Sequence, residues 1–288
     1  MDHILKGAPV AAAIKARTKD QADRLAARGI GPTLTVLEVG GRADNAAYLR
    51  GITKNAEACG ISLRRLSFPE TVSQAEMLAV LKEVNADPSV HGILLLRPLP
   101  EQLDEAALCA AIRPEKDVDA ATDLSLAGIF SGKALGFAPC TAQAVMEILK
   151  FWEVPLSGLR CAVVGRSLVV GRPLAMLLLG ENATVTICHS KTKDLPAVTR
   201  EADLVVAALG KARALDGRYF GENQILIDVG IHRLEDGSLS GDIDFAAAEP
   251  KAQAITPVPG GVGAVTTAVL LSHVVQAAEK NNKERYIT

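Results

Sequence analysis

Residues 160–173, RCAVVGRSLVVGRP, predict a strand, a turn and the start of a helix. The apolar start predicts a buried strand, Gly165 and Gly171 bracket a turn, and the apolar segment AMLLLG (175–180) predicts a helix. In such a strand–turn–helix unit, backbone N–H groups at the start of the helix can bind a pyrophosphate. The spacing is not GxGxxG, so an ordinary tight turn between strand and helix stays open as the alternative.

Strand-length and helix-length segments alternate along nearly the whole chain. This pattern is typical of βαβ units around parallel sheets, and a length of 288 residues favours two domains. The predicted class is therefore α/β. The predicted strands are 33–39, 61–68, 92–96, 160–164, 184–188, 204–208 and 225–229. The predicted helices are about 8–28, 44–59, 73–86, 141–151, 171–179 and 264–280.

Two segments indicate how the chain divides into domains. Residues 119–138 lack a clean period, so we place the region between the domains there. The loop TPVPGGVG (256–263) can redirect the chain sharply, because it is rich in glycine and proline. The last helix could then pack on the first domain. We therefore expect one domain from residues 1–138 plus 264–288, and a second from 139–263.

Charge and composition favour a small-molecule ligand. The 31 Lys and Arg residues nearly balance the 33 Asp and Glu residues, and no long basic run occurs. This balance argues against nucleic acid or an anionic membrane as the main partner. Charged residues interrupt the first ten positions, and no apolar run approaches the roughly 18 residues that span a bilayer. We therefore expect a cytoplasmic protein.

The cysteines fit the same compartment. They are scattered singly, without a CxxC pair, which favours reduced thiols over disulfides or a zinc site. They are Cys59, Cys109, Cys140, Cys161 and Cys188.

The next predicted strand bears on the choice of nucleotide. It ends at HSKT (189–192), where the second strand of a dinucleotide-binding fold normally reads the adenosine ribose. NAD sites often place Asp or Glu there, but this corner carries hydroxyl and basic groups, and Arg166 is nearby in the glycine turn. A 2′-phosphate would find positive partners, which favours NADP over NAD. His189 could be an acid–base group, although the sequence identifies no partner for it.

Two further strands end with a glycine, at Gly210 and Gly230. Strand ends on one edge of such a sheet line its ligand crevice. Asp228 lies beside the second of these glycines and either caps a turn or contacts the ligand; both readings stay open.

Several ordered motifs together resemble the methylenetetrahydrofolate dehydrogenase/methenyltetrahydrofolate cyclohydrolase family. The motifs are GRSxxVGRP, HSKT, LIDVGIHRLEDGSLSGDIDF (226–245), ITPVPGGVG (255–263), NADPSVHGILLLRPLP (85–100) and PEKDVDA (114–120), together with Tyr48. The resemblance covers nearly the full length. It implies an N-terminal folate-binding domain completed by the C-terminal helix, a Rossmann-type NADP domain facing it across a cleft, and a homodimer.

The resemblance also implies site residues. Tyr48 would stack on the pterin, and Asp119 would form hydrogen bonds to it. The alternatives that stay open are a core aromatic for Tyr48 and a turn residue for Asp119. The residues expected beside substrate and nicotinamide are Gly260, Gly261 and Val262. Those expected to bind the cofactor are Gly165, Arg166, Ser167, Gly171, Pro173, Ser190, Gly210 and Ile231. No metal is implied.

The chain departs from the family pattern at the polar pair that serves cyclohydrolase chemistry. The family has Tyr-x-x-x-Lys, with Tyr and Lys on one helix face, but the lysine position is Ile52. The family glutamine in VQLPLP falls on Leu96. Lys54 cannot stand in for the lysine, because six residues place it about 120° from Tyr48 around a helix. Smaller departures are Ala120, Ala142 and Ala264–Val265.

These departures separate the two family activities. Hydride transfer to NADP depends mainly on positioning, whereas hydrolysis of the methenyl product needs acid–base groups that contribute about 10²–10⁴-fold. We therefore expect an NADP-dependent methylenetetrahydrofolate dehydrogenase whose cyclohydrolase activity is reduced or absent. Two alternatives stay open: a catalytically silent protein that binds folate or nucleotide, and an NADP oxidoreductase with a different, more apolar substrate.

Overall fold

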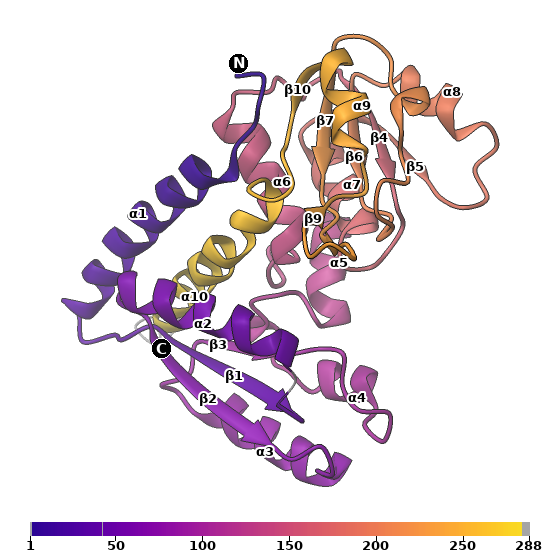
Figure 1. Cartoon of the computed structure of the whole chain (residues 1–288). Coiled ribbons are helices and arrows are strands. Elements are labelled where there is room, and N and C mark those ends of the chain that lie inside the picture. The colour runs from indigo at the N-terminus through magenta and orange to yellow at the C-terminus, as the bar shows by residue number, and fades with distance from the viewer. Residues whose placement is uncertain (1, 42, 284–288) are drawn as a thin grey trace. The chain divides into compact units, whose positions relative to one another are not determined.

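The computed structural model describes residues 2–41 and 43–283 (Figure 1). The chain forms two compact units, one from Met1–Ala12 and Thr141–Thr266 and the other from Ala13–Cys140 and Thr267–Thr288. We call them the five-stranded unit and the three-stranded unit after their parallel sheets. The first residues join the five-stranded unit because Ile4 bridges Ile255 and the Gly7 N–H donates to the Gly260 carbonyl at 2.8 Å.

The sheet of the five-stranded unit is parallel throughout, in the order β10-β7-β6-β4-β5. Its strands are β4 (Arg160–Val164), β5 (Thr184–Cys188), β6 (Leu204–Ala207), β7 (Gln224–Asp228) and β10 (Ala252–Ile255). The chain passes from β4 to the edge strand β5 and then returns beyond β4 to β6. The strand order therefore reverses between β4 and β6, and such a switch point is where open α/β sheets bind ligands.

Short helices and a hairpin connect these strands. They are α7 (Gly171–Gly180), α8 (Leu195–Arg200), η2 (Gly217–Tyr219), the hairpin of β8 (His232–Arg233) and β9 (Leu239–Ser240), α9 (Phe245–Ala248), η3 (Glu249–Lys251) and η4 (Val262–Ala264). Helix α6 (Cys140–Phe151) precedes β4. The central strands β6 and β7 are wholly buried, which explains why their residues do not alternate between apolar and polar; only Gln224 and Asp228 at the ends of β7 are polar.

The sheet of the three-stranded unit has the order β2-β1-β3 and is also parallel. Its strands are β1 (Thr33–Val39), β2 (Ser62–Phe68) and β3 (Gly92–Leu95). The helices that join this sheet are α2 (Ala43–Ala58), α3 (Gln74–Ala86), α4 (Glu105–Ala110), η1 (Pro114–Lys116) and α5 (Asp123–Ser131). Helix α1 (Gly7–Ala26) begins in the five-stranded unit, and α10 (Thr266–Lys283) ends the described chain.

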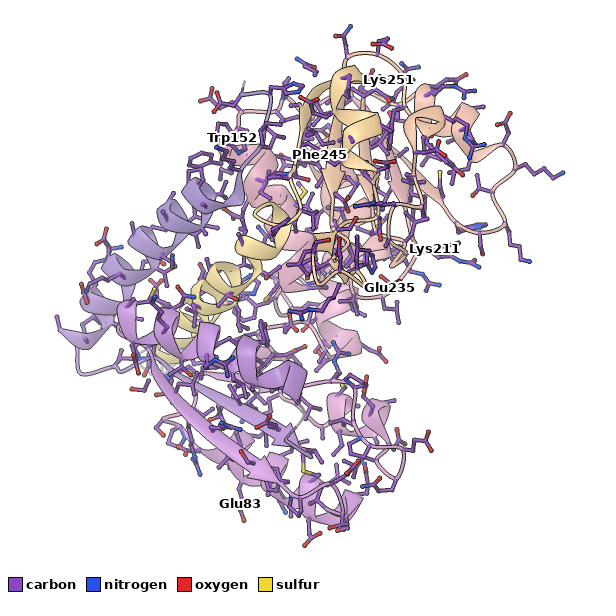
Figure 2. All side chains as sticks on the ribbon, in the orientation of Figure 1. Glu83, Trp152, Lys211, Glu235, Phe245 and Lys251 are labelled. Carbon is purple, nitrogen blue, oxygen red and sulfur yellow. The ribbon has the colours of Figure 1, made fainter. Side chains whose placement is uncertain are left out.

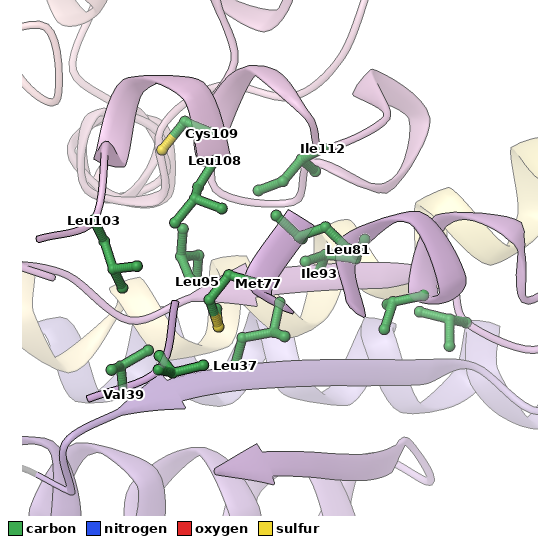
Figure 3. Packing of buried hydrophobic residues seen from close by; sticks show 13 residues of the cluster. Leu37, Val39, Met77, Leu81, Ile93, Leu95, Leu103, Leu108, Cys109 and Ile112 are labelled. Carbon is green, nitrogen blue, oxygen red and sulfur yellow. The ribbon is translucent and has the colours of Figure 1, made fainter. Parts of the chain in front are cut away.

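One face of the three-stranded sheet packs against α3 and α4 (Figure 3). Leu37 and Leu95 from the strands meet Met77 and Leu81 from α3, and Leu108 from α4 completes the cluster. These side chains are at most 6 % exposed. Burying each one contributes about 1.5–3 kcal/mol relative to exposure, so this layer holds β3 and the loops after it in place.

Lys116 fixes the chain just before the candidate site. Its ammonium is buried and donates to the carbonyl oxygens of Val84, Asn85 and Asp87 at 3.1, 2.8 and 2.6 Å. These carbonyls lie at the C-terminal end of α3, where a cation is favourable. The segment that follows, Asp117–Asp119, is thereby tied to the sheet layer.

The structure confirms the α/β class, and the seven predicted strands and six predicted helices are present with ends within about three residues. No helix was predicted within 119–138, but α5 lies there. Its sequence DLSLAGIFS is apolar on most sides and therefore shows no helical period. Strand β10 and the short helices α4 and α8 were not predicted. The predicted domain boundaries at 138 and 263 stay predictions.

One stretch of the described chain, Val262–Asn282, is long and apolar enough to cross a membrane by length and composition alone. Within the protein, 67 % of its most apolar 18-residue window is buried. Its apolar character is that of a core helix.

Candidate functional site

Tyr48 and Asp119 lie in one electrostatic cluster of the three-stranded unit. Tyr48 lies on α2 and is 40 % exposed. Burial of its phenol raises the pKa of Tyr48, and the negative charge of Asp119 and then Cys140 raises it further. The phenol is therefore neutral at physiological pH, with a ring available for stacking.

Asp119 is held by the first residue of α6. The Cys140 N–H donates to Asp119 Oδ1 at 3.2 Å. Burial raises the pKa of Asp119, while the hydrogen bond from Cys140 and the positive charge of Arg97 oppose the rise. The carboxylate retains acceptor positions that this single backbone contact does not use.

The residue before Asp119 is anchored to α10. The Val118 carbonyl oxygen lies 2.9 Å from His273 Nδ1 and 3.4 Å from Cys140 Sγ. The His273 ring also packs on Phe137, with 4.8 Å between the ring centroids. The last helix of the chain therefore helps to position the Asp119 backbone.

Asp117 fixes the other side of this segment, a role that sequence analysis did not identify. Its carboxylate accepts hydrogen bonds from the Ala121 and Thr122 N–H groups, both at 2.8 Å, and from the Ser125 hydroxyl at 2.7 Å. It is only 1 % exposed and therefore acts within the fold. The signal that could have found it is the DxxxxT spacing before a helix, since Thr122 is the N-cap of α5.

The glycine turn of the five-stranded unit lies at the switch point of its sheet. A Cβ atom on Gly165, where φ is +138°, would collide with the Ala208 carbonyl oxygen at the end of β6. A Cβ atom on Gly171 would collide with the Gly165 carbonyl oxygen. Only glycine fits at these two positions, and the close packing brings the start of α7 to the carboxyl ends of β4 and β6.

The other predicted residues of this turn point in different directions. Arg166 and Ser167 are exposed, whereas Pro173 is buried in the first turn of α7. Ser167 Oγ accepts a hydrogen bond from the Val170 N–H at 3.1 Å, so this hydroxyl stabilises the turn itself. The exposed guanidinium of Arg166 can contact an anion.

The corner after β5 is a tight turn built on His189. The Lys191 N–H donates to His189 Nδ1 at 3.1 Å, and the His189 N–H donates to Thr192 Oγ1 at 2.9 Å. These bonds give His189 a structural role and leave Ser190 exposed between them.

Asp228 caps the turn after β7, as one of the two sequence readings predicts. Its buried carboxylate accepts the N–H groups of Gly230 and Asp242 at 2.9 Å and of Ile243 at 2.8 Å. Burial raises the pKa of Asp228 to about 6, the three N–H groups oppose the rise, and the charge of Asp242 adds to it. Ile231 directly follows Gly230 in this turn and is 57 % exposed.

The loop before η4 is packed against the N-terminal segment. Gly260, with φ +100°, accepts the Gly7 N–H through its carbonyl oxygen, and a Cβ atom on Gly7 would collide with the Gly261 carbonyl. Val262 is 2 % exposed. Of these three predicted residues, the two glycines therefore offer backbone groups and Val262 contributes to packing.

Two family models match the chain. The model "Tetrahydrofolate dehydrogenase/cyclohydrolase, catalytic domain" matches residues 5–119, and "Tetrahydrofolate dehydrogenase/cyclohydrolase, NAD(P)-binding domain" matches residues 139–282. The chain belongs to the tetrahydrofolate dehydrogenase/cyclohydrolase family. The resemblance stated from the motifs is therefore confirmed.

Relatives in this family match over almost their whole length. Bifunctional protein FolD 1 of Desulfitobacterium hafniense is 48 % identical over 279 residues, which cover 97 % of this chain and 99 % of that protein. The crystal structure of the bifunctional FolD enzyme of Campylobacter jejuni is 40 % identical, with a TM-score of 0.94 over 96 % of this chain and 98 % of the other. The Trypanosoma brucei FolD structure, in complex with NADP cofactor and inhibitor, is 33 % identical, with a TM-score of 0.91 over 97 % and 98 % of the two chains.

Apolar, buried residues occupy the two positions where the family pattern has a polar pair. Ile52 lies within α2 and is fully buried, and Leu96 is 6 % exposed directly after β3. The Leu96 N–H donates to the Leu37 carbonyl at 3.0 Å, which continues the ladder with β1. Lys54 is exposed on the same continuous helix.

Within residues 2–41 and 43–283, the His, Cys, Asp and Glu side chains form no group of three or more that could hold a metal ion. All five cysteines are buried free thiols.

Proposed function

We propose that this protein oxidises 5,10-methylenetetrahydrofolate to 5,10-methenyltetrahydrofolate with NADP, and that its cyclohydrolase activity is reduced or absent. The match of both family models over the chain supports the dehydrogenase activity. The observation that carries the second part is the complete burial of Ile52, which places a hydrocarbon where the family's lysine would be.

In this proposal, Asp119 and Tyr48 bind the folate. A carboxylate can accept the N–H groups that a pterin ring presents, and the half-exposed ring of Tyr48 offers a stacking face. The family resemblance adds Gly260, Gly261 and Val262 to the proposed substrate residues. The hydride step then needs positioning above all, because the folate nitrogen lone pairs supply the electronic push.

The residues at the switch point fit a dinucleotide phosphate. The close packing of Gly165 and Gly171 brings the start of α7 to the strand ends, where helix N–H groups suit a pyrophosphate. The exposed Arg166 and Ser190 suit a 2′-phosphate. Ser167, Pro173, Gly210 and Ile231 complete the proposed site. Bound NADP supplies the hydride acceptor. These side chains bind and orient it and favour NADP over NAD.

The missing polar pair bears on hydrolysis of the methenyl product. Neither Ile52 nor Leu96 can move a proton or activate water. Replacing both members of a polar pair by apolar groups can be nearly neutral for stability, whereas removing one leaves a buried polar group that costs about 1–3 kcal/mol. The paired change therefore supports a site adapted to work without hydrolysis.

We also propose a cytoplasmic homodimer, and a folate domain of residues 1–138 plus 264–288 that works with a nucleotide domain of residues 139–263. The free thiols support a reducing compartment. The edge position of β2, which pairs with β1 alone among the described strands, leaves backbone groups that a second copy could cover. Light scattering of the purified protein tests the dimer.

The test of function is an assay with 5,10-methylenetetrahydrofolate and either NADP or NAD. Reduced cofactor with accumulating methenyl product is the expected result. Folded protein that binds NADP and folate without turnover would favour a silent binding protein. Nucleotide reduction with another substrate alone would favour a different oxidoreductase.

A further inference from the structure

We propose that Asp242 is a positioning residue of the nucleotide site, which holds the loops after β6 and β7 in the conformation that receives the cofactor. This inference rests on the proposed function, because it takes those two loops as part of the NADP site. Asp242 is not itself exposed to a ligand, since its exposed fraction is 0 %.

The carboxylate of Asp242 collects three consecutive backbone N–H groups. Its Oδ2 accepts Leu209 and Gly210 at 2.5 and 3.1 Å, and its Oδ1 accepts Lys211 at 2.8 Å. Successive N–H groups that converge in this way form a concave anion-binding site. Here the anion is a side chain of the protein, so loop 209–211 is fixed before any ligand arrives.

The same carboxylate sets the position of the neighbouring loop. A Cβ atom on Gly230 would lie 2.5 Å from Asp242 Oδ1 and 2.6 Å from its Cγ, so only glycine allows this approach. Asp228 accepts the N–H groups of both Gly230 and Asp242 through one oxygen, Oδ1. The ends of β6 and β7 are thus joined through two buried carboxylates.

His232 completes the arrangement from β8. Its Nε2 lies 2.8 Å from Asp242 Oδ1, and its side chain is 22 % exposed. Four polar contacts therefore stabilise one buried carboxylate, as a buried charge requires.

The arrangement also limits what loop 209–211 can offer a ligand. Its three N–H groups are bound to Asp242, and the Lys211 carbonyl accepts the Ala214 N–H at 3.3 Å. The remaining groups are the carbonyl oxygens of Leu209 and Gly210 and the exposed side chains of Leu209 and Lys211. Figure 2 labels Lys211. These carbonyls suit hydrogen-bond donors such as ribose hydroxyls or the nicotinamide amide. They do not suit phosphate oxygens.

The test is Asp242→Asn, with NADPH binding followed by fluorescence titration beside steady-state kinetics. The amide keeps the side-chain shape but replaces one acceptor by a donor that faces backbone N–H groups. We expect the Kd for NADPH and the KM for NADP to rise by at least about tenfold, as for loss of a hydrogen bond to a charged group. The KM for folate should change by less than about threefold.

The matched control is Asp244→Asn. Asp244 lies two residues further on and makes no side-chain cap to α9, so NADPH binding should stay at the wild-type value. His232→Ala provides a milder second variant if Asp242→Asn does not fold. It should weaken NADPH binding about threefold, and His232→Gln should recover most of the loss because it returns an N–H donor.

The outcomes separate the two claims. If the wild-type protein binds NADPH and the folded variants Asp242→Asn and His232→Ala bind it equally well, the positioning role is overturned and the proposed function is not. Equal weakening of folate and NADPH would also overturn it, since that result indicates general loosening. Failure of the wild-type protein to bind NADPH would overturn the proposed function as well.

Discussion

The backbone N–H of Cys140 donates a hydrogen bond of 3.2 Å to Oδ1 of Asp119. This bond joins the start of α6 to the carboxylate that we propose binds the pterin. It orients Oδ1 of Asp119. Because His273 and Cys140 both contact the Val118 carbonyl, the backbone and the side chain of this segment are fixed together.

Asp119→Asn should weaken folate binding without affecting NADPH. An amide accepts through one oxygen only, so at least one hydrogen bond to a charged acceptor is lost, and the folate KM should rise by about tenfold or more. Steady-state kinetics measure this. Asp123→Asn is the control, because Asp123 lies exposed in the first turn of α5. An unchanged folate KM in Asp119→Asn would remove Asp119 from the site.

Folate binding should depend on pH through the same group. The pKa of Asp119 is raised, mainly by burial, so its carboxylate takes up a proton at a higher pH than an ordinary aspartate. Folate affinity should therefore fall as the pH is lowered through this pKa, and Asp119→Asn should abolish that fall. The folate Kd measured from pH 7 downward checks the prediction. A wild-type profile that matches the variant's would contradict it.

Ile52→Lys combined with Leu96→Gln should restore cyclohydrolase activity. The pair returns a group able to move protons, and such groups contribute about 10²–10⁴-fold, so a gain of at least about tenfold is expected. Ile52→Lys alone should lower the free energy of unfolding by about 3–5 kcal/mol, because it buries an ammonium without its partner. Conversion of methenyl- to 10-formyltetrahydrofolate is the measurement.

The control for that pair is Ile52→Met with Leu96→Met, which keeps both positions apolar. It should gain no hydrolysis. A Lys–Gln variant that is folded, binds folate and gains nothing would count against the assignment of the lost activity to these two positions.

Arg166→Ala should reduce the preference for NADP. Loss of a guanidinium–phosphate contact costs about 1.5–3 kcal/mol, so the KM for NADP should rise about 10- to 100-fold while the KM for NAD changes little. Arg160→Ala is the control, since Arg160 is exposed at the opposite end of β4 and pairs with Asp203. Equal effects of Arg166→Ala on both nucleotides would show that Arg166 does not read the 2′-phosphate.

Asp228 should make stability depend on pH. Its pKa is raised to about 6 in the folded protein, from 3.8, because burial disfavours the charged form. The folded state therefore binds the proton more tightly than the unfolded state. Protonation of Asp228 stabilises the folded state fully below about pH 3.8, and this stabilisation is lost as the pH rises through about 6.

The measurement is the difference in free energy of unfolding between wild type and Asp228→Asn, by urea titration at pH 5 and pH 7. The free energy of unfolding of the wild type, relative to that of Asp228→Asn, should be larger at pH 5 than at pH 7. Asp216→Asn should show no such change over this range, because the pKa of Asp216 is lowered by its contacts with Arg218. A wild-type advantage that grows toward pH 7 would contradict the assignment.

Much of the fold follows from local sequence patterns. Buried parallel strands such as LVVA of β6 are short apolar runs, and the glycines at 165 and 171 mark the turn that follows β4. Strand β10 escaped prediction because AQAI has one β-branched residue and its partner, β7, is a separate segment of the chain. Helix α5 escaped because its apolar residues do not keep to one face.

The site was less accessible to sequence analysis. Tyr48 and Asp119 are found through motifs, but the contact between Asp119 and Cys140 joins residues 21 positions apart. The role of Asp242 depends on backbone N–H groups more than 30 positions away, which carry no sequence signal. Whether Ile52 is buried or exposed also had to come from the structure.

The most direct test of the account is a single assay of the purified protein with 5,10-methylenetetrahydrofolate and NADP, in which NADPH and methenyltetrahydrofolate are followed together. We expect NADPH to form and methenyltetrahydrofolate to accumulate in equal amount and to decay no faster than without enzyme. Rapid enzyme-dependent conversion to 10-formyltetrahydrofolate would contradict the conclusion drawn from Ile52 and Leu96.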